Sequence, residues 1–559
     1  MLKKEILKTL EKAGIVTNIE KIETPKNPEF GDLAFACFEI AKEKKVNPIK
    51  MAESITQKIT IEKNSIIKKI LPKSGFINFF IDYKKLLEKL LKQNPIKFDI
   101  GKQKKIMIEY SQPNPVHPMH IGHSRTTFLG DTISRIFEFF GFKTIRANYI
   151  NDVGLQVAKL VFAYQNWAKN KVPETKPDLW LWEYYVKFHD EAEKNPELDE
   201  KARELLRKYE LKKDPATVKL WNQIVDWCLD GFEETYENLG IDFDLYFFES
   251  NFRSLGKKIV EQTIKKNISF VSKEDTVVAD LDKYGLPSIP LVRSDGTGLY
   301  ITSDLGLTVH KFERYHLDSS IWVVSSEQNL YFKQLFKILQ TLGYDWVKNC
   351  IHFSYELVKG PEGKMSSREG RAIMLDEVLK KLIDQASLEV KKRNLKMPVE
   401  EIKETARKIA IGALKYAILK IEPHQQIQFD WKRMLSFDGD TGPYIQYGYS
   451  RGNSILKLSK SRPGEFEVSE FAQEEKDLLK KLSEEDEELI HSFHDLRPHY
   501  ICKYVYDLVT VFNRFYEKMP VLKEQDQNKK NFRLVLVEAA KNTIKDCLNL
   551  LGIEEVDRM

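Results

Sequence analysis

Two short stretches hold the residues best suited to phosphate chemistry. The first, residues 111–123 (SQPNPVHPMHIGH), places His120 and His123 on either side of Gly122. An imidazole N–H can donate to a phosphate oxygen, and glycine lets a nucleotide approach the backbone closely. Two histidines at this spacing are often structural. A metal site is the other reading, but no third ligand with suitable spacing lies nearby.

The second stretch, residues 364–368 (KMSSR), combines a lysine with two hydroxyls. Lys364, Ser366 and Ser367 could stabilise the charge that develops on a leaving pyrophosphate. Glycines on both sides are typical of a loop that can close over a substrate. The second stretch, in this order and at this distance, strengthens the phosphate-binding interpretation of the first.

The elements expected around the first stretch form a βαβ unit. Residues 105–110 are apolar and predict a buried parallel strand, and three prolines then exclude regular structure up to Pro118. Helical spacing of apolar residues predicts a helix over 123–140, and a second strand follows at 144–150. The histidines thus lie where a strand ends and a helix begins, which suits phosphate binding. Asp152, after the second strand, could steer a substrate or make an Asx-turn.

Further polar residues follow apolar runs later in the chain. Glu249 ends one such run, and Gln328 lies just beyond an expected buried strand at 320–325. Tyr300 and Asp304 stand four apart and so share one face of an expected helix. Taken singly, Asp304 reads as a helix-surface acid and Tyr300 as a core residue.

The paired letters HIGH (120–123) and KMSS (364–367) resemble the signature of the class I aminoacyl-tRNA synthetases. The sequence outside the two motifs resembles the arginyl-tRNA synthetases in particular, and this resemblance extends over essentially the whole chain. The segments that carry it are SQPN before the first motif, YINDVG (149–154), RSDGT (293–297) and the ending from Gly552. The resemblance implies an α/β catalytic core with a Rossmann-like parallel sheet. It also implies ATP-dependent formation of arginyl-adenylate, with Mg²⁺ assistance, and transfer to the 2′-hydroxyl of the terminal adenosine of tRNA(Arg). It further suggests that activation requires tRNA.

The same resemblance implies roles for single residues. Catalytic roles fall to His120, His123 and Lys364, and ATP contacts to these three with Gly122, Met365, Ser366 and Ser367. The arginine pocket would comprise Asn114, Glu249, Tyr300, Asp304 and Gln328. A guanidinium offers five donors in a planar fork, so two carboxylates suit it, and lysine could not fill such a site. Many members lack the loop lysine and carry one just before HIGH. Here His117 holds that place and Lys364 is present.

We expect three domains. Residues 1–100 form a small N-terminal α+β domain that resembles the family's additional tRNA-contacting domain. Residues 101–430 form the catalytic domain, with a helical insertion at about 161–235 in which we find no chemistry. Residues 431–559 form an all-α bundle that resembles the family's anticodon-binding domain. Its candidate base contacts are Tyr444, Tyr447, Tyr516 and Met559.

Composition fits this interpretation. The 559 residues have a net charge of +5, so any nucleic-acid surface must come from local patches. Five scattered cysteines indicate a reducing compartment without a zinc site or a disulfide framework, and neither a signal peptide nor an 18-residue apolar run occurs. We expect a cytoplasmic monomer without membrane contact. Two alternatives stay open: a class I synthetase for another amino acid, and a non-catalytic tRNA-binding relative.

Overall fold

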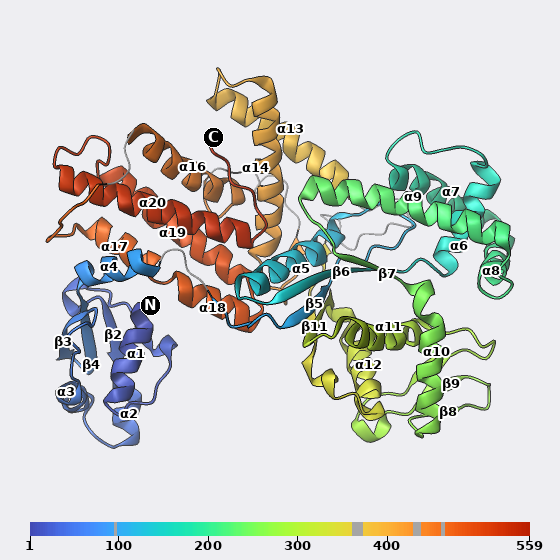
Figure 1. Ribbon diagram of the computed structural model, residues 1–559, viewed down its shortest axis with the longest axis horizontal. Helices are drawn as coiled ribbons and strands as arrows, with labels where there is room; N and C mark the ends of the chain where they lie inside the picture. The colour runs from blue at the N-terminus through green and yellow to red at the C-terminus, as the bar shows by residue number, and fades with distance from the viewer. Residues whose placement is uncertain (94–97, 360–372, 429–435, 437, 460–463) are drawn as a thin grey trace.

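The computed structural model describes the chain except residues 94–97, 360–372, 429–435, 437 and 460–463. Lys364, Met365, Ser366 and Ser367 therefore lie outside the described residues. The described elements form a small N-terminal α+β unit, a central parallel sheet flanked by helices, and a C-terminal helical bundle (Figure 1). This confirms the fold class predicted from the sequence.

The N-terminal unit is an antiparallel sheet in the order β1-β2-β4-β3, with helices packed on it. Its elements are α1 (Leu2–Lys12), β1 (Ile22–Glu23), β2 (Leu33–Ala36), α2 (Phe38–Glu43), α3 (Pro48–Lys58), β3 (Ile67–Lys73), β4 (Phe76–Ile81) and α4 (Tyr83–Gln93). Asp32 precedes β2 and accepts from the backbone N–H of Ile81 at 2.8 Å. Its carboxylate also pairs with Lys480 at 2.7 Å, which ties this unit to the C-terminal bundle.

The central sheet has five parallel strands in the order β12-β11-β5-β6-β7. These are β5 (Lys105–Glu109), β6 (Lys143–Ile150), β7 (Leu245–Phe248), β11 (Ser319–Ser325) and β12 (Cys350–Tyr355). Helix α5 (Ile121–Phe139) joins β5 to β6, so the expected βαβ unit is present, with the helix beginning two residues earlier than predicted. Both faces of such a sheet are covered by helices, which explains the continuous burial of β5 and β11.

Two insertions interrupt this sheet. Between β6 and β7 lie α6 (Leu155–Trp167), α7 (Pro177–Lys194), α8 (Glu197–Glu210) and α9 (Pro215–Leu239). Between β7 and β11 lie α10 (Glu249–Lys265), β8 (Ser269–Val271), β9 (Val277–Ala279), β10 (Ile289–Val292) and α11 (Tyr300–Tyr315). Helix α12 (Asn329–Leu342) joins β11 to β12, and the short strands β13 (Val358–Lys359) and β14 (Ile427–Gln428) pair in parallel. In Figure 1 the helices of the first insertion gather at one end of the molecule, beyond β7.

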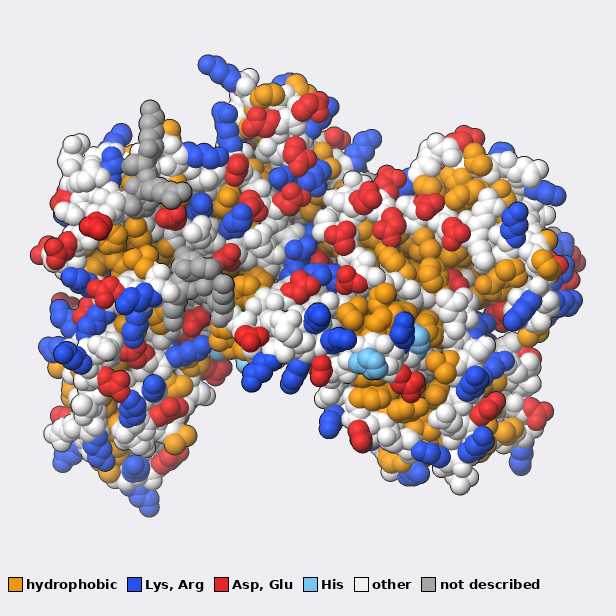
Figure 2. All heavy atoms as spheres, in the orientation of Figure 1, with side chains coloured by type: hydrophobic (Ala, Val, Ile, Leu, Met, Phe, Trp, Pro, Cys, Tyr) orange, Lys and Arg blue, Asp and Glu red, His pale blue; other side chains and the backbone are white. Residues whose placement is uncertain are grey.

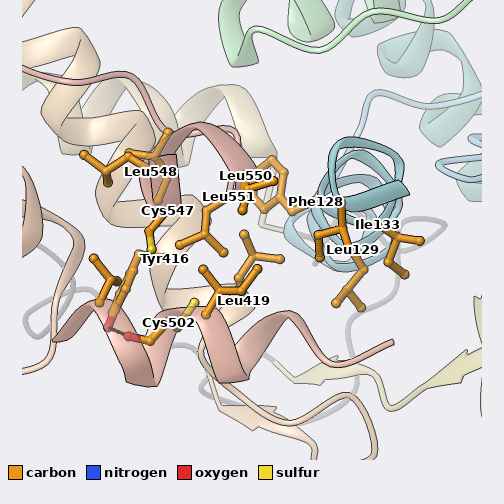
Figure 3. Close-up of a cluster of buried hydrophobic side chains, with 14 of the residues drawn as sticks. Phe128, Leu129, Ile133, Tyr416, Leu419, Cys502, Cys547, Leu548, Leu550 and Leu551 are labelled. Atoms are coloured by element: carbon orange, nitrogen blue, oxygen red, sulfur yellow. Dashed lines mark hydrogen bonds between the residues drawn. The ribbon is translucent and has the colours of Figure 1, made fainter. Parts of the chain in front are cut away.

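The C-terminal helices share a hydrophobic core with the sheet domain. They are α13 (Leu375–Arg393), α14 (Val399–Leu419), α16 (Gly442–Ser459), α17 (Gln473–Leu482), α18 (Glu485–Asp495), α19 (Pro498–Lys518) and α20 (Gln527–Leu550). Figure 3 shows Phe128 of α5 reaching toward Leu550 and Leu551. Leu129 and Ile133 of α5 belong to the same buried cluster, which also includes Leu419. Buried apolar area is the main source of folding free energy, so this contact joins the two parts firmly.

The surface carries charges of both signs. On the face shown in Figure 2, lysines and arginines are interspersed with acidic side chains, in keeping with the small net charge of +5. Within the described parts of the chain, none of the helices combines the length and apolar character needed to cross a membrane.

Candidate active site

Residues 110–120, here called the histidine loop, lie between the carboxyl end of β5 and the first turn of α5. His120 is the N-cap residue, and its Nδ1 accepts from the backbone N–H of Gly122 at 3.0 Å. The backbone N–H of His120 donates to Nδ1 of His123 at 3.1 Å. The two rings stack with their centroids 3.9 Å apart. The helix terminus, which favours anions, is thus capped by the two residues predicted to contact phosphate.

These contacts fix the protonation of both imidazoles. Because each Nδ1 accepts a hydrogen bond, the neutral rings carry their proton on Nε2. Burial, followed by the neighbouring His117, lowers the pKa of His120 to about 3. Burial, followed by His120 and then His117, lowers the pKa of His123 well below its usual value. Both rings are therefore neutral at physiological pH, and each has Nε2–H as its donor.

The chain returns to this loop directly after the second motif. The backbone N–H of Ile121 donates to the carbonyl of Ile373, and that of Leu375 to the carbonyl of Met119, both at 2.9 Å. These hydrogen bonds place residues 373–375, at the start of α13, beside the histidine loop.

A cavity of about 420 Å³ opens beyond the carboxyl ends of β6 and β11, against α11 and α12. Four of the five residues predicted for the arginine pocket line it: Asn114, Tyr300, Asp304 and Gln328. The carboxyl edge of a parallel sheet is where such folds bind ligands, so residues from distant parts of the chain meet here.

Asp304 is a half-buried acid that lines this cavity. The hydroxyl of Tyr331 donates to its Oδ2, whereas Oδ1 finds no hydrogen-bond partner among the described residues. Burial raises the pKa of this carboxyl to about 6. Asp304 is thus a half-buried acid with its Oδ1 shielded from solvent, not the helix-surface residue that it could have been. Sequence reasoning missed Tyr331; its place in the first turn of α12, just past the end of β11, was the available signal.

Glu249, the fifth predicted residue, lies in an adjoining cavity. It is the first residue of α10 and lines a space of about 410 Å³, and Tyr300 lines both cavities. Its Oε1 accepts from Nη2 of Arg253 at 3.1 Å and from the Ser303 hydroxyl at 3.4 Å. Within the described structure its Oε2 is buried without a hydrogen-bond partner. Burial raises the pKa of Glu249 to about 7.

Asp152 supports the start of the same helix. Its Oδ1 accepts from the backbone N–H of Ser250 at 2.9 Å, and its carbonyl accepts from Nε1 of Trp221 at 2.8 Å. This contact, which was neither of the two roles weighed from the sequence, fixes the residue that follows Glu249.

The four residues predicted to contact tRNA fall into separate groups. Tyr447 on α16 and Tyr516 on α19 lie on either side of Arg451, whose guanidinium carbon is 4.9 Å from each ring centroid. The hydroxyl of Tyr444 accepts from Asn513 at 3.0 Å. Met559 packs elsewhere, against an apolar cluster between α13 and α14.

The described residues contain no group of three or more side chains placed to hold a metal ion.

Comparison with known proteins identifies the class and then the family. A family model for "tRNA synthetases class I (R), catalytic domain" matches residues 85–431, so the sheet and its histidine loop are those of a class I synthetase. Models for an arginyl-tRNA synthetase N-terminal domain and a DALR anticodon-binding domain match residues 1–81 and 445–559. The chain belongs to the arginyl-tRNA synthetase family.

Individual relatives agree with this assignment. An arginine–tRNA ligase of Clostridium perfringens is 37% identical over 553 residues, which cover 97% of this chain and 96% of that one. A Clostridium kluyveri arginine–tRNA ligase is 36% identical, with 96% of each chain covered. The solved arginyl-tRNA synthetase of Thermus thermophilus superposes with a TM-score of 0.84 at 26% identity, covering 100% of this chain and 99% of that one. The family resemblance drawn from the motifs is confirmed.

Proposed function

We propose that this chain, an arginine–tRNA ligase by family, holds the guanidinium of arginine between Asp304 and Glu249, beside Tyr300. One observation carries the proposal: each of these buried carboxylates keeps one oxygen without a hydrogen-bond partner in the described structure. A buried acceptor left unsatisfied is costly, and a substrate with several donors relieves that cost. Asn114 and Gln328 line the same cavity and are our candidates for the polar end of arginine.

ATP activates the amino acid in the first step. The carboxylate of arginine attacks the α-phosphorus in line, the bond to the bridging oxygen breaks, and pyrophosphate leaves. His120 and His123 donate from Nε2 to the phosphate oxygens, while Gly122 leaves room for the nucleotide. Because both rings stay neutral, they stabilise developing charge as fixed dipoles. In the second step the 2′-hydroxyl of the tRNA end attacks the carbonyl carbon of the adenylate, and AMP leaves.

Lys364, Met365, Ser366 and Ser367 complete the proposed ATP site, with the lysine stabilising the leaving pyrophosphate. Mg²⁺ fits the same step. It usually takes its ligands from substrate phosphates, water and one or two carboxylates, which suits a protein whose described residues form no metal cage. When bound, it would supply positive charge to the triphosphate.

We further propose the division into residues 1–100, 101–430 and 431–559 as tRNA-contacting, catalytic and anticodon-binding domains. The exposed ring of Tyr516 and the neighbouring Tyr447 are our candidates for stacking on anticodon bases. Tyr444 and Met559 are the remaining candidates. We also propose that the protein is a monomer, and a cytoplasmic location fits the free thiols of the described cysteines.

Arginine-dependent ATP–pyrophosphate exchange, with and without total tRNA and with lysine as a parallel substrate, tests this function. We expect exchange with arginine only, and only when tRNA is present. Exchange with lysine would favour a synthetase for another amino acid. Tight tRNA binding without exchange for either amino acid would favour a non-catalytic relative.

A further inference from the structure

The helical insertion reaches the arginine site through one ion-pair chain. Arg253 lies one turn after Glu249 on α10 and donates through Nη2 to Glu249 Oε1 at 3.1 Å. Its other terminal nitrogen, Nη1, pairs with the carboxylate of Glu210, the last residue of insertion helix α8. The three side chains are largely buried, with exposures of 2% for Glu249, 13% for Glu210 and 24% for Arg253. Two consecutive ion pairs, here called the relay, thus connect the insertion to the proposed pocket through Glu210, Arg253 and Glu249.

The relay uses only one oxygen of Glu249. Arg253 and Ser303 both donate to Oε1, so Oε2 stays available. An isolated carboxylate this deeply buried would favour its neutral form, because burial penalises the charged one. A neutral carboxyl would lose most of its attraction for a guanidinium. An internal cation that occupies one oxygen keeps the other ready for an external cation.

We propose that Arg253 is a positioning residue of the arginine site, which holds Glu249 in its charged form and in place, and that Glu210 fixes Arg253 from the helical insertion. The inference rests on the proposed role of Glu249 in binding arginine. It assigns a task to an insertion in which the sequence alone indicates no chemistry.

The groups around Glu249 make this cation necessary. Acidic groups approach from two other elements, Asp304 on α11 and Asp152 after β6, and both disfavour its charged form. Three tyrosine hydroxyls also lie near Glu249, and burial together with its charge raises the pKa of each: Tyr149 on β6, Tyr300 on α11 and Tyr331 on α12. Arg253 is the cation in direct contact with Glu249 in the described structure. Even with it present, the pKa of Glu249 is raised to about 7.

Arg253→Met keeps much of the aliphatic stem and removes the charge. Loss of an opposite charge at contact distance raises a carboxyl pKa by roughly 1–3 units, so we expect the KM for arginine at pH 7 to rise about tenfold or more. The ratio of variant to wild-type KM then falls toward about 2–3 at pH 9, because Glu249 ionises as the pH rises. The ratio is measured by tRNA-dependent pyrophosphate exchange between pH 7 and 9, so titration of free arginine cancels.

Three further variants sharpen the test. Arg253→Lys retains a cation and should restore most of the arginine affinity, and Glu210→Gln should give a smaller rise with the same pH trend. Arg207→Met, an exposed arginine of the same cavity that pairs with Glu200 at 3.0 Å, should leave the KM unchanged. A ratio for Arg253→Met that is constant with pH, or close to one, would overturn the proposal. If Asp304→Asn still weakens arginine binding in that case, the proposed function stands and only the relay fails.

Discussion

Asp304→Asn is expected to raise the KM for arginine by about tenfold or more, with little change in the KM for ATP. The substitution exchanges a buried carboxylate for a neutral amide of the same shape, so a charge-assisted pair with the substrate guanidinium is lost. Such a pair is worth roughly 1.5–3 kcal/mol, and about 1.4 kcal/mol corresponds to a tenfold change in affinity. Pyrophosphate exchange at varied arginine and ATP concentrations gives both constants.

Tyr331→Phe is the matched control for Asp304→Asn. It removes the hydroxyl that donates to Oδ2 and leaves the charge in place, so the KM for arginine should change far less. Because the pKa of Asp304 is raised to about 6, arginine affinity in the wild type should also weaken as the pH falls through 6. A KM that Asp304→Asn leaves unaltered would remove Asp304 from the pocket.

His123→Ala should slow adenylate formation by about 100-fold, a cost typical of losing one fixed donor to a developing charge, with the KM for arginine nearly unchanged. His123→Asn can still accept from the backbone N–H of His120, so it separates the capping role from the donor role. We expect it to unfold at the same temperature as the wild type and to remain slow. His491→Ala, on α18 and away from the site, is the control. Single-turnover formation of adenylate is the measurement.

Lys364→Ala should affect the same step as His123→Ala and should weaken arginine binding much less. An adenylate rate equal to that of the wild type would exclude Lys364 from a role with the leaving pyrophosphate. A uniform rise in every KM, in either variant, would point instead to a general disturbance of the site.

Local patterns predicted the elements that carry the site, because the apolar strands and the helix after Gly122 follow from short-range periodicity. The grouping of Asn114, Asp304 and Gln328, which line one cavity, was instead predicted from the family resemblance. The cavity that Glu249 lines is formed between α8 and α10, which are joined by the Arg253–Glu210 ion pair, and periodicity does not encode such long-range contacts. The spacing of Glu249 and Arg253, one helical turn apart, was a readable signal of their pairing.

The core drawn in Figure 3 bears on how the protein unfolds. Phe128 and Leu129 of α5 are buried in one cluster with residues of α14 and α20, so the proposed boundary at 430 divides one core between two domains. Heat should then melt the sheet and the helical bundle in a single calorimetric transition, because neither part keeps its apolar contacts once the other has opened. In that case the C-terminal helices and the proposed phosphate-binding histidines would belong to one cooperative unit.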